Sequence, residues 1–240
     1  MLVEVCANSL ESALNAEKAG ADRIELCSEL AVGGITPSFG LLKTIKEQIS
    51  IPVHVLIRTR SGDFTFSEDE FEIMKKDIAI CRELGVEGIV SGALQKDFNL
   101  DLDKTMELRE ASGPLKFTFH RAFDWVKEPF KVLKQLEGMG IDYILTSGQQ
   151  NSSPEGLELL TELHRKTTTC IIMPGGGIGP KNINRFKEIG FSAVHLSAVK
   201  FERTLEETPS VSMNSPSFLS DDELGISNLE TIRTIVNGVK

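Results

Sequence analysis

The sequence predicts an α/β fold, a single (β/α)8 TIM barrel spanning residues 1–240. Short β-branched runs alternate with helical patterns from end to end, which is typical of βα repeats. Dividing 240 residues by eight units gives about 30 residues per unit, the length of one βα repeat. A doubly wound sheet is the alternative, but such a sheet rarely keeps eight regular units.

The predicted strands are short apolar runs: Leu2–Ala7, Arg23–Ser28, Pro52–Arg58, Gly88–Leu94, Lys116–Phe123, Tyr143–Ser147, Cys170–Pro174 and Ala193–Val199. The predicted helices carry apolar residues at helical spacing: Ser9–Ala19, Phe39–Gln48, Glu68–Leu84, Leu102–Glu110, Glu128–Met139, Glu155–Lys166, Asn182–Ile189 and Asn228–Val236. Four helices leave through variants of one turn, in which a glycine cap precedes the next strand. These turns are Gly-Ala-Asp at 20–22, Gly-Val-Glu at 85–87, Gly-Ile-Asp at 140–142 and Gly-Phe-Ser at 190–192.

One segment has no periodicity. Residues 202–225 are polar and contain Pro209 and Pro216. We expect an irregular loop at the barrel rim, between the eighth strand and the last helix. A lid over the site and a loop without function both remain open.

Composition excludes several classes of partner. The net charge is −9, which argues against nucleic acid and against an anionic membrane surface. No apolar run approaches the roughly 20 residues of a membrane span. The first basic residue is Lys18, unlike the charged start of a signal peptide. The four cysteines form no CxxC pair, so we expect a reduced, cytoplasmic protein.

Four side chains at the ends of the first two strands are predicted to share the barrel interior. Side chains alternate between the faces of a strand, so Glu4 lies beside Cys6, and Glu25 beside Cys27. The opposite faces are aliphatic and need a covering layer. An unpaired buried carboxylate is costly, so the Glu/Cys faces must look into polar surroundings.

Barrel active sites lie at the C-terminal ends of the strands, where this chain has many ionisable residues. His120, Glu25 and Asp124 are the candidate catalytic residues, with His120 and Glu25 moving protons. The same alternation predicts one buried polar network: Glu4, Glu25, His54, Arg58 and His120. A neutralised ion-pair cluster without catalytic role is the alternative interpretation, and the sequence does not separate the two.

Glycines follow the seventh predicted strand, and Ser197 lies at the end of the eighth. Many barrels hold a phosphate there with bare backbone N–H groups. The predicted anion ligands are Gly175, Gly176, Gly177, Ser197, Arg58 and Arg60. A tight turn without ligand is the alternative.

The thiols of Cys6 and Cys27 are predicted to approach each other, because neighbouring strands lie about 4.8 Å apart. Two thiolates suit Cu(I), whereas a zinc site would require four ligands. Free cysteines also occur simply as small buried hydrophobes, which is the interpretation for Cys81 and Cys170.

Together these residues resemble the CutC family, the copper homeostasis proteins. The resemblance covers roughly Leu2 to Val199 and is most distinctive at 118–124. It rests on these motifs: Val3–Cys6, Arg23–Cys27, Gly33–Ser38, His54–Arg58, Gly62–Phe64, Gly92–Leu94, Thr118–Asp124, Thr146–Gly148 and Gly175–Gly177. Thr59 and Phe66 stand where the family usually has proline and tyrosine. The resemblance leaves any role of Ser212 or Met213 open.

The resemblance implies a cytoplasmic (β/α)8 barrel, usually a homo-oligomer, that binds Cu(I) through Cys6 and Cys27 and uses no nucleotide cofactor. No reaction is established for the family. Two functions therefore compete: a copper-binding protein, and an enzyme that performs acid/base chemistry on a small anionic or phosphorylated metabolite. A scaffold without chemistry is a third. The number of ionisable groups at the rim favours the enzyme, since a copper carrier does not require them.

Overall fold

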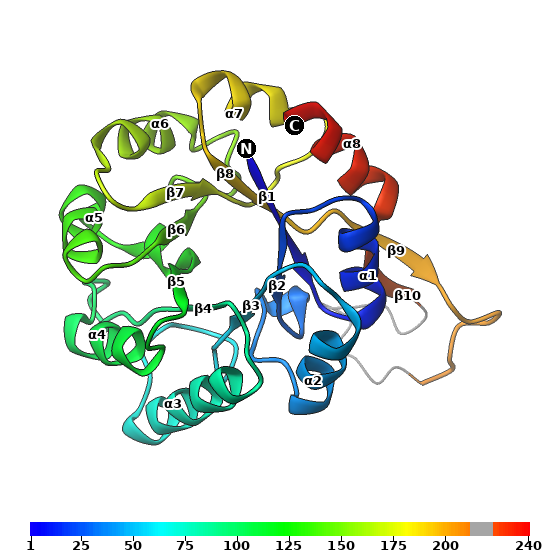
Figure 1. Ribbon diagram of the computed structural model, residues 1–240, viewed down its shortest axis with the longest axis horizontal. Coiled ribbons are helices and arrows are strands. Elements are labelled where there is room, and N and C mark those ends of the chain that lie inside the picture. The colour runs from blue at the N-terminus through cyan, green and yellow to red at the C-terminus, as the bar shows by residue number, and fades with distance from the viewer. Residues whose placement is uncertain (212–222) are drawn as a thin grey trace.

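The computed structural model describes residues 1–211 and 223–240. Eight parallel strands form the (β/α)8 barrel that the sequence predicts, with neighbours in chain order from β1 to β7 and with β8 beside β1. β8 meets the β7 side through a parallel bridge between Gly175 and His195. Figure 1 looks along the barrel, with the strands around the axis and the helices outside.

β1 has its predicted bounds, Leu2–Ala7. The other seven strands are shorter than predicted: β2 Arg23–Leu26, β3 Val53–Leu56, β4 Gly88–Ser91, β5 Lys116–Phe119, β6 Tyr143–Thr146, β7 Ile171–Pro174 and β8 Ala193–Leu196. The predicted fifth strand ran to Phe123, but the chain turns at His120 into a short 3-10 helix, η2, at Arg121–Trp125. Another 3-10 helix, η1, follows β2 at Leu30–Val32. Residues beyond the strand ends therefore form the rim that carries the site.

The helices lie close to their predicted ranges: α1 Leu10–Lys18, α2 Phe39–Gln48, α3 Glu68–Glu83, α4 Leu102–Ala111, α5 Pro129–Gly138, α6 Leu157–Lys166, α7 Ile183–Ile189 and α8 Leu229–Val239. Polar caps define several of their starts, because a side-chain oxygen accepts a backbone N–H of the first turn. The caps are Ser9, Ser38, Ser67, Asp101 and Asn228. None of the described helices is long and apolar enough to cross a membrane.

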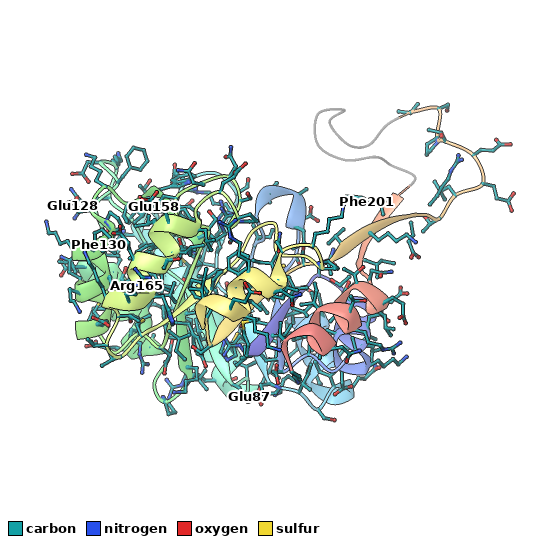
Figure 2. All side chains as sticks on the ribbon, turned by 90° about the horizontal axis from the view of Figure 1, so that it is seen from above. Glu87, Glu128, Phe130, Glu158, Arg165 and Phe201 are labelled. Atoms are coloured by element: carbon teal, nitrogen blue, oxygen red, sulfur yellow. The ribbon has the colours of Figure 1, made fainter. Side chains whose placement is uncertain are left out.

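The sequence predicted an irregular loop at residues 202–225, between β8 and α8, but both ends of this segment belong to strands. β9 (Val199–Arg203) pairs with β10 (Glu223–Ser227) as an antiparallel two-stranded arm. Figure 2 shows this arm extending from the barrel, with Phe201 on it. The base of the arm is fixed, because the Ser227 hydroxyl donates to the carbonyl of Cys6 at 3.0 Å. Ser212 and Met213 lie outside the described residues.

The repeated helix-exit turns have a structural role at the N-terminal end of the barrel. The acid at the third position of three of these turns accepts a backbone N–H at the start of the preceding strand, from its first or second residue. Asp22 accepts from Val3, Glu87 from Val53, and Asp142 from Phe117, at 2.8, 2.8 and 2.9 Å. In the fourth turn the backbone carbonyl of Ser192 accepts from Leu2 at 2.8 Å. These bonds satisfy N–H groups that would otherwise be unpaired.

We expect Asp142→Ala to lower the free energy of unfolding by about 1–3 kcal/mol, because the N–H of Phe117 loses its acceptor. Urea unfolding monitored by circular dichroism measures this. Glu162→Ala is the matched control, since the exposed carboxylate of Glu162 makes no hydrogen bond within the described chain. An equal effect in the two variants would contradict the assigned role.

Candidate functional site

A buried carboxylate, Glu4, organises the barrel interior. Arg23 Nε donates to Glu4 Oε2, and His195 Nδ1 lies 2.8 Å from Glu4 Oε1. Burial alone would raise the pKa of Glu4, but the Arg23 charge and the hydrogen bond to His195 outweigh it and lower the pKa to about 2. Glu4 is therefore ionised and holds the His195 ring in place.

Glu25 has the opposite character. Burial, assisted by the charge of Glu4 and opposed by His195, raises the pKa of Glu25 to about 7. Its Oε2 lies 3.7 Å from His195 Nδ1. Burial lowers the pKa of His195, but the carboxylates of Glu25 and Glu4 overcome this and raise it. Glu25 and His195 thus form a coupled pair in which a proton is available near neutral pH.

A cavity of about 590 Å³ opens at the C-terminal ends of the strands. It brings together eight of the residues predicted from the sequence: Cys6, Glu25, Arg58, His120, Asp124, Gly176, Gly177 and Ser197. His195 lines it too. Gly175, Arg60 and Cys27 do not line it. The volume falls within the range of small-molecule sites.

The glycine loop, Gly175–Ile178, presents unpaired donors to this cavity. Its carbonyls are held from behind: Gly175 by the Ser153 hydroxyl, Gly176 by the Ser153 N–H and Gly177 by the Asn182 amide, each at 2.8 Å. The N–H groups of Gly176, Gly177 and Ile178 have no acceptor within residues 1–211 and 223–240. Gly176 and Gly177 have φ of 99° and 76°, a backbone conformation that would be strained in a residue with a side chain. Successive free N–H groups of this kind form anion-binding concavities.

Arg121 places a positive charge beside the loop. Its Nη1 lies 3.3 Å from where a Cβ on Gly176 would be. Its Nε donates to Asp124 and its Nη2 to Ser147, both at 2.8 Å, which orients the guanidinium. Sequence reasoning did not include Arg121 among the anion ligands, although it directly follows His120 in the most distinctive motif.

The two arginines predicted as anion ligands have other partners. Arg58 is buried and donates to the carbonyls of Val32, Gly34 and Gly62, which ties two rim loops together. Burial lowers its pKa. Arg60 donates to Glu70 at 2.6 Å and to Asp63 at 3.2 Å, outside the cavity.

His120 and Asp124 differ in what they offer. His120 Nδ1 accepts the N–H of Ala122 at 3.3 Å, which assigns the ring proton to Nε2, an atom without an acceptor in the described chain. Burial and the charge of Arg58 lower its pKa to about 3, so the ring is a neutral donor. Asp124 accepts from Thr146, Ser147, Gln149 and Arg121, and so positions a neighbouring loop and Arg121.

The two cysteines approach as predicted, with their Sγ atoms 3.4 Å apart. Cys6 lines the cavity, whereas Cys27 is fully buried and is covered by Gly34. The hydrogen bond between Cys6 and Cys27, burial and the nearby carboxylates raise the pKa of the Cys6 thiol well above its usual value. Donor atoms of Cys6, Glu25 and His195 all lie within 4.8 Å of one another.

Arg23 was missed at the sequence level. It shares a strand face with Glu25 and Cys27, so the alternation that selected them also places Arg23 in the interior. Its guanidinium lies 4.1 Å from the ring centroid of Tyr143 in addition to its bond with Glu4.

The chain is thus a (β/α)8 barrel protein with a polar cavity at the C-terminal mouth. The model of the CutC family matches residues 1–200, and the chain belongs to this family. The CutC family protein of Photorhabdus laumondii is 47% identical over 196 residues, which cover 82% of this chain and 79% of the relative. That of Citrobacter koseri is 45% identical over 197 residues, with the same coverages.

Solved structures agree. The CutC protein of Streptococcus agalactiae, named for copper homeostasis, superposes with a TM-score of 0.78 at 32% identity, covering 82% of this chain and 98% of that chain. Thiamine phosphate pyrophosphorylase of Pyrococcus furiosus has a TM-score of 0.62 at 13% identity, covering 100% of this chain and 95% of that one, and shares the fold alone.

The raised pKa of Glu25 predicts a specific pH dependence. Between its usual value of 4.5 and about 7, folded Glu25 binds a proton that the unfolded chain has released. The folding stability of the native protein should therefore fall as the pH rises through this window, by up to about 3 kcal/mol. Glu25→Gln should flatten this dependence.

Urea unfolding at several pH values between about 5 and 8 measures the effect. Glu162→Gln, an acid-to-amide change on the exposed surface, is the control and should keep the native slope. A Glu25→Gln protein with an unchanged slope would show that Glu25 ionises normally.

Proposed function

We propose that the protein is an enzyme that performs acid/base chemistry on a small anionic metabolite held in the cavity. The observation that carries the proposal is the position of Glu25 and His195, a coupled pair titrating near neutrality, in the same cavity as the unpaired N–H groups of the glycine loop. Catalytic groups with pKa values near the working pH are the most effective proton carriers.

Each part of the cavity has a distinct task in this proposal. Gly176, Gly177 and Ser197 hold the anion, with Arg121 supplying charge. Glu25 accepts a proton from the bound molecule and later returns it, while His195, fixed by Glu4, stabilises the charge that develops in between. His120 donates a hydrogen bond as a neutral group. Arg58 and Asp124 maintain the loops.

Binding of inorganic phosphate tests the anion site. Isothermal titration calorimetry should detect phosphate binding to the native protein and a loss of about tenfold in Arg121→Gln, because a charge-assisted contact is removed. Arg60→Gln is the matched control: Arg60 lies outside the cavity and its removal should leave the affinity unchanged. Equal losses in the two variants would contradict the specific role assigned to Arg121.

Solvent exchange tests the chemistry without knowledge of the reaction. The protein is incubated in D2O with pools of phosphorylated metabolites, and loss of C–H signals is followed by proton NMR. A metabolite that exchanges with native protein should not exchange with Glu25→Gln, and Glu162→Gln should retain the rate. Exchange that survives in Glu25→Gln would remove Glu25 from the mechanism.

A second candidate function, Cu(I) binding, is supported by the cysteine pair. The two Sγ atoms 3.4 Å apart are soft donors on neighbouring strands, and the family name and the Streptococcus agalactiae relative point to copper homeostasis. His195 would be a further donor beside Cys6. The raised pKa of Cys6 opposes binding, because Cu(I) must displace the thiol proton.

Competition of the reduced protein with a chromophoric Cu(I) chelator decides this candidate. Cys6→Ser and Cys27→Ser should each lower the affinity more than about tenfold, and binding should strengthen as the pH rises. Cys81→Ser is the control, since Cys81 is buried on α3. Affinity that is the same in all variants would exclude the cysteine pair.

Both candidates place the protein in a reducing, cytoplasmic setting, and the four free cysteines support this. A homo-oligomer remains our expectation from the family.

A further inference from the structure

An aromatic wall lines one side of the cavity, and the proposed chemistry does not use it. Phe64 and Trp125 both line the cavity. The ring of Phe64 lies 4.8 Å from the ring of His120 and 4.8 Å from that of Trp125, measured between centroids. The wall therefore runs without interruption from the polar interior to the mouth.

Trp125 is the residue of this wall whose side chain still has surface free to contact a ligand. It remains 45% exposed, although it is the only tryptophan of the chain. Its contacts with Phe64 and Phe98 are edge-on, with interplanar angles of 66° and 80°. Large apolar rings exposed at a cavity mouth are typical of ligand sites.

One rigid element connects this wall with the anion site. η2 carries Arg121 at its start, beside Gly176, and Trp125 at its end, beside Phe64. Asp124 fixes the start through Arg121, and the amide of Gln149 donates to the carbonyl of Val126 at 2.6 Å just beyond the end. The separation between the anion site and the wall is thus set by backbone, which favours a ligand of defined length.

We propose that the ligand is a phosphate monoester of a planar ring, with the phosphate on the glycine loop and Arg121 and the ring against Trp125 and Phe64. A phosphate alone would leave most of the 590 Å³ cavity unfilled. A flat ring uses the exposed face of Trp125, while the His120 imidazole beside Phe64 offers a neutral donor to its polar substituents. This inference rests on the proposed function, because it assumes the anion site.

Phenyl phosphate and cyclohexyl phosphate are the probes, since they match in size and charge and differ in planarity. Calorimetry should give an affinity for phenyl phosphate about three- to tenfold above that for cyclohexyl phosphate, and cyclohexyl phosphate should bind at least as well as inorganic phosphate. Phenyl phosphate should also change the fluorescence of the single tryptophan in a saturable manner, whereas inorganic phosphate should not.

Variants separate the two halves of the site. Trp125→Leu should abolish the preference for phenyl phosphate and keep inorganic phosphate binding. Phe98→Leu is the matched control: Phe98 contacts Trp125 but does not line the cavity, so the preference should persist. Arg121→Gln should weaken all three ligands by a similar factor.

These experiments distinguish failure of the planar-ring inference from failure of the proposed function. Inorganic phosphate binding without preference between the two esters would overturn the planar-ring assignment and leave the proposed function standing. A preference that persists in Trp125→Leu would overturn the role of the wall. Absence of binding by all three ligands would overturn the anion site, and the inference with it.

Discussion

The buried charge of Glu4 is the constraint on which the rest of the site depends. A carboxylate in the closed interior of a barrel costs several kcal/mol unless it is paired and hydrogen-bonded. Arg23 on β2 and His195 on β8, the two strands that flank β1 in the barrel, provide this compensation. Burial, assisted by the charge of ionised Glu4, makes a second charge on Glu25 unfavourable and raises the pKa of Glu25 to about 7. The structural ion pair and the proton-carrying pair are therefore parts of one network.

Around this network, charged residues of the rim hold loops and neutral groups face the ligand space. Arg58 binds three loop carbonyls, and Asp124 accepts hydrogen bonds from a neighbouring loop and from Arg121. Among the described residues, the groups of the cavity without a hydrogen-bond partner include backbone N–H groups of the glycine loop, Nε2 of His120 and Oε2 of Glu25. Oriented neutral donors suit an anion, since they need little rearrangement when it binds. The proposed anion site is therefore compatible with a net charge of −9, because its donors act locally.

Local chemistry explains how much of this was predictable. The glycines at the helix ends and the β-branched runs located the helices and strands. Strand alternation placed Glu4, Glu25 and Cys6 together in the barrel interior. Strand alternation did not reveal the partners of Arg58 and Arg60, because the contacts of a long side chain depend on loops that follow no period. Sequence patterns also did not predict the arm of β9 and β10. Its two strands are separated by residues 204–222, and neither strand by itself indicates its partner.

The sequence by itself determined the barrel, the family and most of the predicted residues that reach its mouth, since these depend on periodicities of two and 3.6 and on short motifs. Only the tertiary structure decided which residues hold the fold and which remain available to a ligand. Burial and neighbouring charges give Glu4 a pKa of about 2 and Glu25 one of about 7, although the two glutamates occupy similar strand positions. That difference arises from distances across β8, β1 and β2, which no pattern within a single strand contains.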